Sequence, residues 1–325
     1  MSADVQVAVD VMGWYATSAS TVTPGSLYLA AAPERWLDSR VDGDRTRLAP
    51  GDFLELPIEF DETGGRRLTA MQFNLTATGG FGNGWFTAWN GAGDPPGTSA
   101  LNFSVGETSP NLVTVPVRRV GAGSRPGSGL YLAVVENTSR SSAHLIVDAA
   151  GSYFTDPANY GSTHVVVPAT RIGDSRTGLG TAKGTVAGGR TVNVSVPTGL
   201  VTDRADAFEG VLTMANPTAA TYLTMFASGE DRPATSSVNS TAARNRSNGF
   251  STYPGCLDAA CRPGYAVYNS AGAVNVILDV TGRFDLTDET IGAVGAPPAK
   301  RAPNAAPKAV ADRTPKLAAT PTVRR

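Results

Sequence analysis

The chain carries the stretch Leu145-Ile146-Val147-Asp148-Ala149-Ala150-Gly151-Ser152-Tyr153, an apolar run that holds one Asp and ends in Gly and an aromatic residue. The same pattern occurs in Val7-Ala8-Val9-Asp10-Val11-Met12-Gly13-Trp14-Tyr15 and in Val276-Ile277-Leu278-Asp279-Val280-Thr281-Gly282-Arg283-Phe284. Aliphatic and β-branched runs bounded by Gly predict buried strands. An Asp inside such a strand costs several kcal/mol unless it is paired, so its return in every copy predicts a fixed partner.

The spacing of these strands and of other blocks predicts a duplicated domain. Asp10, Asp148 and Asp279 lie 138 and 131 positions apart, which is the size of a domain. Three further blocks return 137 positions later in the chain, at 74–76 and 211–213, at 85–89 and 222–226, and at 94–102 and 231–239. Several blocks at a near-constant offset indicate an internal repeat.

Each repeat contains about seven short apolar segments separated by turn residues, which predicts an antiparallel β-sandwich of Greek-key or jelly-roll type. We therefore expect an all-β protein with two tandem sandwiches, at 24–154 and 164–284, joined by a linker at 155–163. A terminal strand and connector (1–23) precede them. A disordered tail rich in Pro, Ala, Lys and Arg (285–325) follows, either as a solubilising linker or as a basic segment that binds an anionic polymer.

The composition argues against several classes of protein. The 325 residues have a formal net charge of -1, so no overall field attracts the chain to nucleic acid or to anionic lipid. No apolar run reaches about 18 residues, so no membrane span is expected. The first residues, Met1-Ser2-Ala3-Asp4, have no basic region followed by an apolar core, and no signal peptide is expected in this chain.

The two cysteines, Cys256 and Cys261, lie in a short loop between Pro254 and Pro263. We expect them to form a local disulfide, which would indicate an oxidising compartment, with a pair of free thiols as the alternative. No His lies near them and their spacing fits no ligand signature, so no zinc site is expected.

An Arg-x-x-Asp-Ser-Arg corner opens each repeat. Its charged residues are Arg35, Asp38 and Arg40 in the first repeat and Arg171, Asp174 and Arg176 in the second. Because an Arg near a strand end can hold a buried carboxylate through two parallel hydrogen bonds, we expect a structural clamp with Asp148 and Asp279 as the partners. A site for an acidic or sugar ligand and a calcium site are the alternatives.

Aromatic residues recur on one short strand of each repeat. Trp85 and Trp89 share one face and Phe86 has the other, and the second repeat has Tyr222 and Phe226 at the positions of the two tryptophans. We expect the tryptophan face to lie in the core. Contact with a glycan or a protein partner is the alternative, because exposed aromatic rings provide flat stacking surfaces.

Catalytic motifs are missing from the sequence. The chain has two histidines, His144 and His164, and neither a Gly-x-Ser-x-Gly nor a His-Glu-x-x-His motif. His144 precedes Asp148 by four residues, which in a strand separates them by about 13 Å. We therefore expect a protein that is not an enzyme and has no catalytic residue, no cofactor and no metal.

The corner and strand motifs together resemble a repeat family of secreted and surface proteins from actinobacteria. The family pattern is Pro-x-Arg-Leu-Leu-Asp-Thr-Arg, then Asn-(Val/Leu)-Thr, Pro-x-x-Ser-x-Leu-Asn and Val-Asp-Val-x-Gly-Tyr-(Phe/Tyr). This chain has Pro33-Glu34-Arg35-Trp36-Leu37-Asp38-Ser39-Arg40, Asn74-Leu75-Thr76 and Ser99-Ala100-Leu101-Asn102, and the resemblance covers about 1–284. It implies non-catalytic β modules that are often joined to cell-wall hydrolases or peptidases, with similar modules in virions of actinobacterial phages.

The strand at 7–15 precedes the first repeat instead of closing one. Three interpretations are open. The natural protein is longer at its N-terminus, the strand belongs to the first sandwich, or it completes the sheet of a neighbouring subunit by donor-strand pairing.

These observations predict an extracellular or cell-surface module that binds a cell-wall glycan or another protein and acts as a spacer. The alternatives are a structural virion protein, in a tail or in capsid decoration, and an accessory part of a cell-wall hydrolase. Self-association through 7–15 is expected to be possible for this chain, and no specific nucleic-acid partner is expected.

Overall fold

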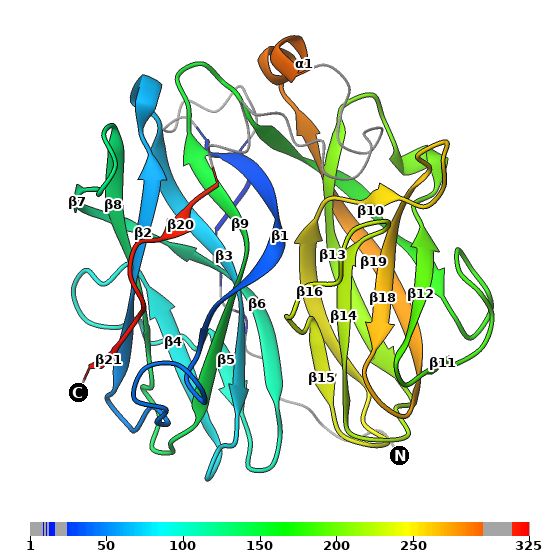
Figure 1. Ribbon diagram of the computed structural model, residues 1–325, viewed down its shortest axis with the longest axis horizontal. Helices are drawn as coiled ribbons and strands as arrows, with labels where there is room; N and C mark the ends of the chain where they lie inside the picture. Colours follow the sequence, from blue (N-terminus) through cyan, green and yellow to red (C-terminus); the bar gives the residue numbers. More distant parts are fainter. Residues whose placement is uncertain (1–8, 10, 12, 17–24, 295–313, 325) are drawn as a thin grey trace.

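The computed structural model describes residues 9, 11, 13–16, 25–294 and 314–324, and in this part the molecule is nearly all β. Two antiparallel sandwiches lie side by side, one for each repeat (Figure 1). Each sandwich has an inner sheet, next to the other repeat, and an outer sheet that packs on the inner one across a hydrophobic core.

The first repeat forms nine strands within the described residues, compared with about seven expected from the apolar segments. They are β1 (Leu27–Asp38), β2 (Phe53–Asp61), β3 (Arg67–Thr78), β4 (Gly84–Trp89), β5 (Leu101–Phe103), β6 (Ser109–Pro116), β7 (Arg118–Ala122), β8 (Ser128–Glu136) and β9 (His144–Thr155). A single 3-10 turn, η1 (Thr63–Gly65), follows β2. Strands β1, β3, β6 and β9 form the inner sheet, and the others belong to the outer sheet.

The second repeat follows the same path. Its strands are β10 (Ser162–Asp174), β11 (Val186–Ala187), β12 (Arg190–Ser195), β13 (Ala205–Ala215), β14 (Thr221–Ala227), β15 (Val238–Ser240), β16 (Arg246–Thr252), β17 (Gly255–Cys256), β18 (Pro263–Asn269) and β19 (Ala273–Leu286), with η2 (Thr198–Leu200) after β12. Strands β10, β13, β16 and β19 are inner, and β12, β14, β15, β17 and β18 are outer. Each inner or outer strand of the first repeat therefore has a counterpart in the second.

The two inner sheets are halves of one continuous sheet with the order β16-β13-β19-β10-β1-β9-β3-β6. We call it the central sheet. Its halves join where Tyr28 of β1 pairs with Ser162 of β10. The two ends of the path also meet, since Asn248 of β16 accepts a hydrogen bond from the backbone of Leu112 in β6 (2.9 Å) and donates one to Asn74 (2.7 Å).

Each sandwich has its own hydrophobic core between the inner and outer sheets. The first core includes Leu54, Phe73, Phe86, Val135 and Val147, all of them almost fully buried. A second core of the same kind fills the other sandwich. Between the repeats lies a small third cluster around Tyr28, Ala207 and Phe284. Alternation along the inner strands explains this arrangement, because one face of each strand enters a core and the other faces the opposite repeat.

The segment that the sequence assigns to the tail includes regular structure. Strand β19 ends at Leu286, and helix α1 (Asp288–Val294) follows it. Two short strands, β20 (Lys316–Leu317) and β21 (Val323–Arg324), pair with β2 and are drawn in red in Figure 1. Residues 295–313 lie outside the described part of the chain.

No helix among the described residues has both the length and the apolar character needed to cross a membrane.

Candidate functional site

The recurring strand motif occupies the centre of each half of the central sheet. Strand β9 lies between β1 and β3, and β19 lies between β10 and β13. This register places Asp148 opposite Arg35 and Asp279 opposite Arg171. Asp10, the Asp of the first motif copy, lies outside the described residues.

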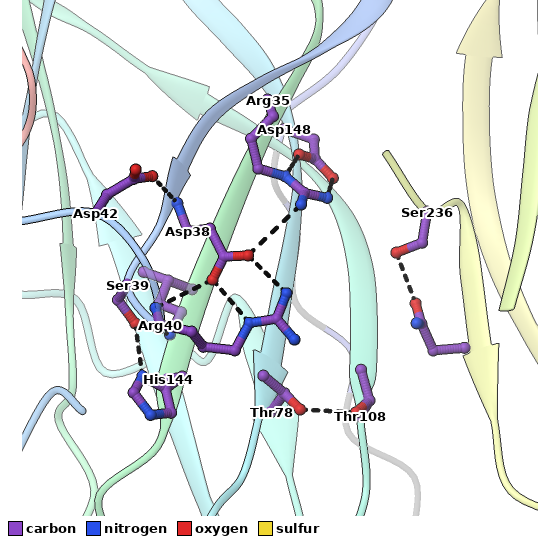
Figure 2. A network of polar contacts seen from close by, with 12 residues as sticks. Arg35, Asp38, Ser39, Arg40, Asp42, Thr78, Thr108, His144, Asp148 and Ser236 are labelled. Carbon is purple, nitrogen blue, oxygen red and sulfur yellow. Dashed lines mark hydrogen bonds and ion pairs between the residues drawn. The ribbon is translucent and has the colours of Figure 1, made fainter. Parts of the chain in front are cut away.

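In the first repeat the predicted clamp residues form one ion-pair network (Figure 2). Arg35 donates to both carboxylate oxygens of Asp148, with Nε–Oδ1 at 2.6 Å and Nη2–Oδ2 at 3.2 Å. Asp38 accepts two hydrogen bonds from the guanidinium of Arg40, at 2.8 and 2.6 Å, and lies 3.6 Å from Arg35. Burial raises the pKa of Asp148, and the hydrogen bonds from Arg35 oppose that shift. The pair therefore compensates a charge that is costly to bury.

The second repeat reproduces the clamp in a more open setting. Arg171 donates to Asp279 at 2.8 and 3.2 Å, and Arg176 donates to Asp174 at 2.9 and 2.7 Å. The side chain of Asp279 is 28% exposed, whereas that of Asp148 is 1% exposed. Asp148 lines a small pocket between the repeats together with residues of the second repeat such as Ser236. The inter-repeat contact therefore buries one clamp more deeply than the other.

Lowering the pH is expected to remove the contribution of Asp174 to stability. The hydrogen bonds from Arg176 lower the pKa of Asp174 to about 2. Since an unfolded Asp has a pKa of about 3.9, the ionised form stabilises the fold above about pH 4, and this contribution disappears as the pH falls toward about 2. The difference in unfolding free energy between the wild type and Asp174→Asn, measured by urea titration, should shrink over this range. A difference that stays constant down to about pH 2 would contradict the prediction.

The Gly of the motif makes room for a side chain from the neighbouring strand. A Cβ at Gly151 would lie 2.8 Å from the ring Cζ of Tyr28, and a Cβ at Gly282 would lie 2.6 Å from Glu209 Oε1 and also meet His164. Tyr28 and His164 are 136 positions apart, the same offset as Arg35 and Arg171. The motif Gly thus serves the same purpose in both repeats.

The side chains that these glycines admit meet between the repeats, in a cluster that we call the seam: Tyr28, Gln72, Tyr153, His164, Glu209, Ser251 and Phe284. The hydroxyl of Tyr28 donates to Gln72 Oε1 (3.0 Å) and accepts from Ser251 Oγ (2.8 Å). His164 Nε2 lies 2.8 Å from Glu209 Oε1. The ring of Phe284 stacks on Tyr28 with the ring centroids 4.0 Å apart. Sequence reasoning missed this cluster, because the paired positions hold different residue types.

Tyr15, the aromatic end of the first motif copy, also contacts the seam. Its ring stacks on His164 with a centroid distance of 3.6 Å, and its hydroxyl lies 3.1 Å from the Tyr153 hydroxyl and 3.2 Å from Glu209 Oε2. Burial raises the pKa of Tyr15 to about 12. Residues 13–16 belong to no strand. The first motif copy therefore contacts both repeats through the side chain of Tyr15 and not through strand pairing of these residues. Of the strand expected at 7–15, residues 9, 11 and 13–15 are described and belong to no strand, whereas residues 7, 8, 10 and 12 lie outside the described part.

The aromatic residues of β4 face the opposite way from the expectation. Phe86 is the core residue of β4, whereas Trp85 is 42% exposed on the outer face, with Trp89 half-buried on the same face. The expectation of a tryptophan face in the core is therefore wrong, because the phenylalanine fills that space. In the second repeat Tyr222 is 37% exposed, and Phe226 is buried and does not offer its ring to solvent.

Cys256 and Cys261 are joined by a disulfide that closes the short loop after β17. Of the two histidines, His144 contacts Ser39 and His164 belongs to the seam. Within the ranges that the structure describes, no group of three or more His, Cys, Asp or Glu side chains is placed to hold a metal ion.

No protein-family model and no curated protein matches the chain.

Proposed function

We propose that the chain is a non-catalytic binding and spacing module of an extracellular or cell-surface protein, and that the outer sheet of each sandwich holds one contact site for a glycan. One observation carries this proposal. Trp85 on β4 lies directly opposite Asn102 on β5, and Tyr222 on β14 lies directly opposite Asn239 on β15. An exposed aromatic residue and an amide therefore recur at matching positions on both outer faces.

The chemistry of this pair suits a sugar ring. An aromatic face stacks on the apolar face of a pyranose, while an amide both donates hydrogen bonds to and accepts them from sugar hydroxyls. In the second repeat another aromatic ring lies beside the exposed one. The ring of Tyr222 lies 6.3 Å from that of Tyr268, and the guanidinium of Arg232 covers the Tyr268 ring at 3.8 Å.

The continuous central sheet supports the spacing part of the proposal. It connects the sandwiches through strand pairing, and each outer sheet belongs to a different sandwich (Figure 1). Two weak sites on one chain gain avidity toward a polymer that presents many copies of one sugar. The Cys256–Cys261 disulfide favours an oxidising compartment, such as the outside of the cell. The family resemblance makes the actinobacterial wall the first polymer to test.

Replacing the exposed aromatics is expected to weaken binding to a glycan-rich wall. The purified chain and its Trp85→Ala, Tyr222→Ala and double variants would be sedimented with isolated actinobacterial cell walls at two salt concentrations. Loss of a stacking residue costs about 1 kcal/mol per site, so each single variant should bind about five-fold more weakly. The double variant should bind about thirty-fold more weakly, because the losses at two separate sites add.

The matched control is Phe81→Ala, which removes another exposed aromatic side chain, in the loop between β3 and β4, where its ring contacts the guanidinium of Arg47. It should bind as the wild type does, and wild-type binding should resist salt, since stacking does not depend on charge. Equal binding by the wild type and the double variant would refute the proposed sites. Failure of all forms to bind, together with self-association on a sizing column, would favour the second candidate, a structural virion protein. The exposed apolar side chains of Val9, Val11 and Trp14 favour that candidate.

A further inference from the structure

The open side of edge strand β2 is covered by the C-terminal segment 314–324. Leu317 pairs with Ile58 and Lys316 with Glu59, and further along Arg324 pairs with Phe53 and Val323 with Leu54. Ala318 N also donates to Pro57 O at 2.9 Å. The segment thus runs antiparallel to β2 and extends the outer sheet by strand addition.

Side chains make this contact specific. Leu317 and Val323 pack against the first hydrophobic core, and Pro315 and Pro321 are buried. Arg324 Nε lies 2.6 Å from Glu55 Oε2 on β2. The acceptor edge therefore recognises two apolar side chains and one basic side chain at fixed positions along an extended segment.

The counterpart edge in the second repeat lacks these features. Strand β12 pairs with β18 and, within the described residues, with no strand on its other side. At one end its backbone is already used, because Ser195 N donates to Gly180 O at 2.9 Å. Strand β12 also contains no acidic residue that could replace Glu55. The acceptor site is thus a property of the first repeat alone.

The contact is small and its donor is remote in the chain. Four residue pairs join the segment to β2, compared with nine between β2 and β8. Nineteen residues, 295–313, separate α1 from Thr314. In extended form such a length spans up to about 65 Å. The same segment of a second copy can make every one of these contacts without any new complementarity.

We propose that β2 is a strand-acceptor site and that segment 314–324 is a transferable donor strand, so that the segment of one copy pairs with β2 of a second copy. A tethered donor has an effective concentration in the millimolar range, so dilute copies keep their own segment. When copies are held close together at high local concentration, the segment of one copy pairs with β2 of the next, and the copies become joined. The donor strand for self-association is then the C-terminal segment, in place of the N-terminal strand 7–15.

A peptide of residues 314–325 tests the acceptor site. The acceptor is the full chain with Leu317→Asp and Val323→Asp, which should empty β2 without touching the sandwich. The labelled peptide should bind this variant at least ten-fold more tightly than the wild type, where the tethered segment competes. Adding Glu55→Arg to the acceptor should weaken binding about three-fold, the effect of one exposed ion pair. Absence of binding at about 1 mM, or equal binding to the variant and the wild type, would overturn the proposal.

Cysteine trapping tests the exchange itself with other variants. Full-length Phe53→Cys and Arg324→Cys proteins would be mixed and oxidised, since these positions face each other across the two strands. A disulfide-linked dimer should form and increase with protein concentration. The control mixture replaces Phe53→Cys by Thr191→Cys, on β12. If the control gives as much dimer, the segment is not transferred to β2.

Discussion

Asp148→Ala is expected to lower the free energy of unfolding by about 3 kcal/mol. Removing one member of a buried ion pair leaves the other charge buried without that partner. The side chain of Asp148 is 1% exposed, and Arg35 is left with Asp38, 3.6 Å away, as its remaining partner in the network. The raised pKa of Asp148 shows that burial of this charge is itself costly, so the loss arises mainly from the uncompensated Arg35. Urea unfolding at neutral pH measures the difference.

The second repeat provides the matched control. Asp279→Ala removes the equivalent carboxylate, but the Asp279 side chain is 28% exposed and that of Arg171 is 44% exposed. Water can replace the lost partner there, so the cost should be about 1 kcal/mol or less. A loss below about 0.5 kcal/mol for Asp148→Ala, or equal losses for the two variants, would show that the buried clamp does not stabilise the fold.

Gly151→Ala is expected to lower the unfolding free energy by about 1–3 kcal/mol, the usual cost of overpacking. The new Cβ would lie 2.8 and 2.9 Å from the Cζ and Cε2 atoms of Tyr28. Tyr28 cannot move aside easily, because it is buried and its hydroxyl is hydrogen-bonded to Gln72 and Ser251. The substitution should therefore push β1 away from β9 at the seam.

Two other glycines calibrate that result in the same unfolding assay. Gly121 in β7 has no atom within 4 Å of an added Cβ, so Gly121→Ala should be close to neutral. Gly282→Ala should cost less than Gly151→Ala, since its clash includes the flexible Glu209 side chain. A Gly151→Ala protein as stable as Gly121→Ala would contradict the role assigned to the motif Gly.

The sequence predicts the all-β fold class well because strand pattern and repeat spacing carry independent information. It also leads to the clamp partners, since a buried Asp in a strand requires a cation and each corner motif offers one. The predicted orientation of β4 was wrong, and the reason is physical. A period of two separates Trp85 from Phe86, but it does not determine which of the two faces enters the core.

The seam and the tail pairing were beyond prediction for different reasons. Tyr28 and His164 occupy matching positions but differ in chemistry, so a search for repeated residues passes over them. The pairing of 316–317 and 323–324 involves only two residues at a time, which leaves no periodic signal. The Pro and Lys content of the segment predicts disorder. The segment is ordered because its backbone pairs with the edge of β2, which its own sequence does not reveal.

The late arrival of the strand that covers β2 affects how the protein is made. Strand β2 and its partner β8 are complete once residue 136 has left the ribosome, but their covering strand begins at residue 316, 180 residues later. At a synthesis rate of about 5–20 residues per second, the edge waits about 10–40 s for its cover. Throughout that interval each nascent chain displays an unpaired strand to its neighbours on the same messenger, a setting that promotes wrong pairing.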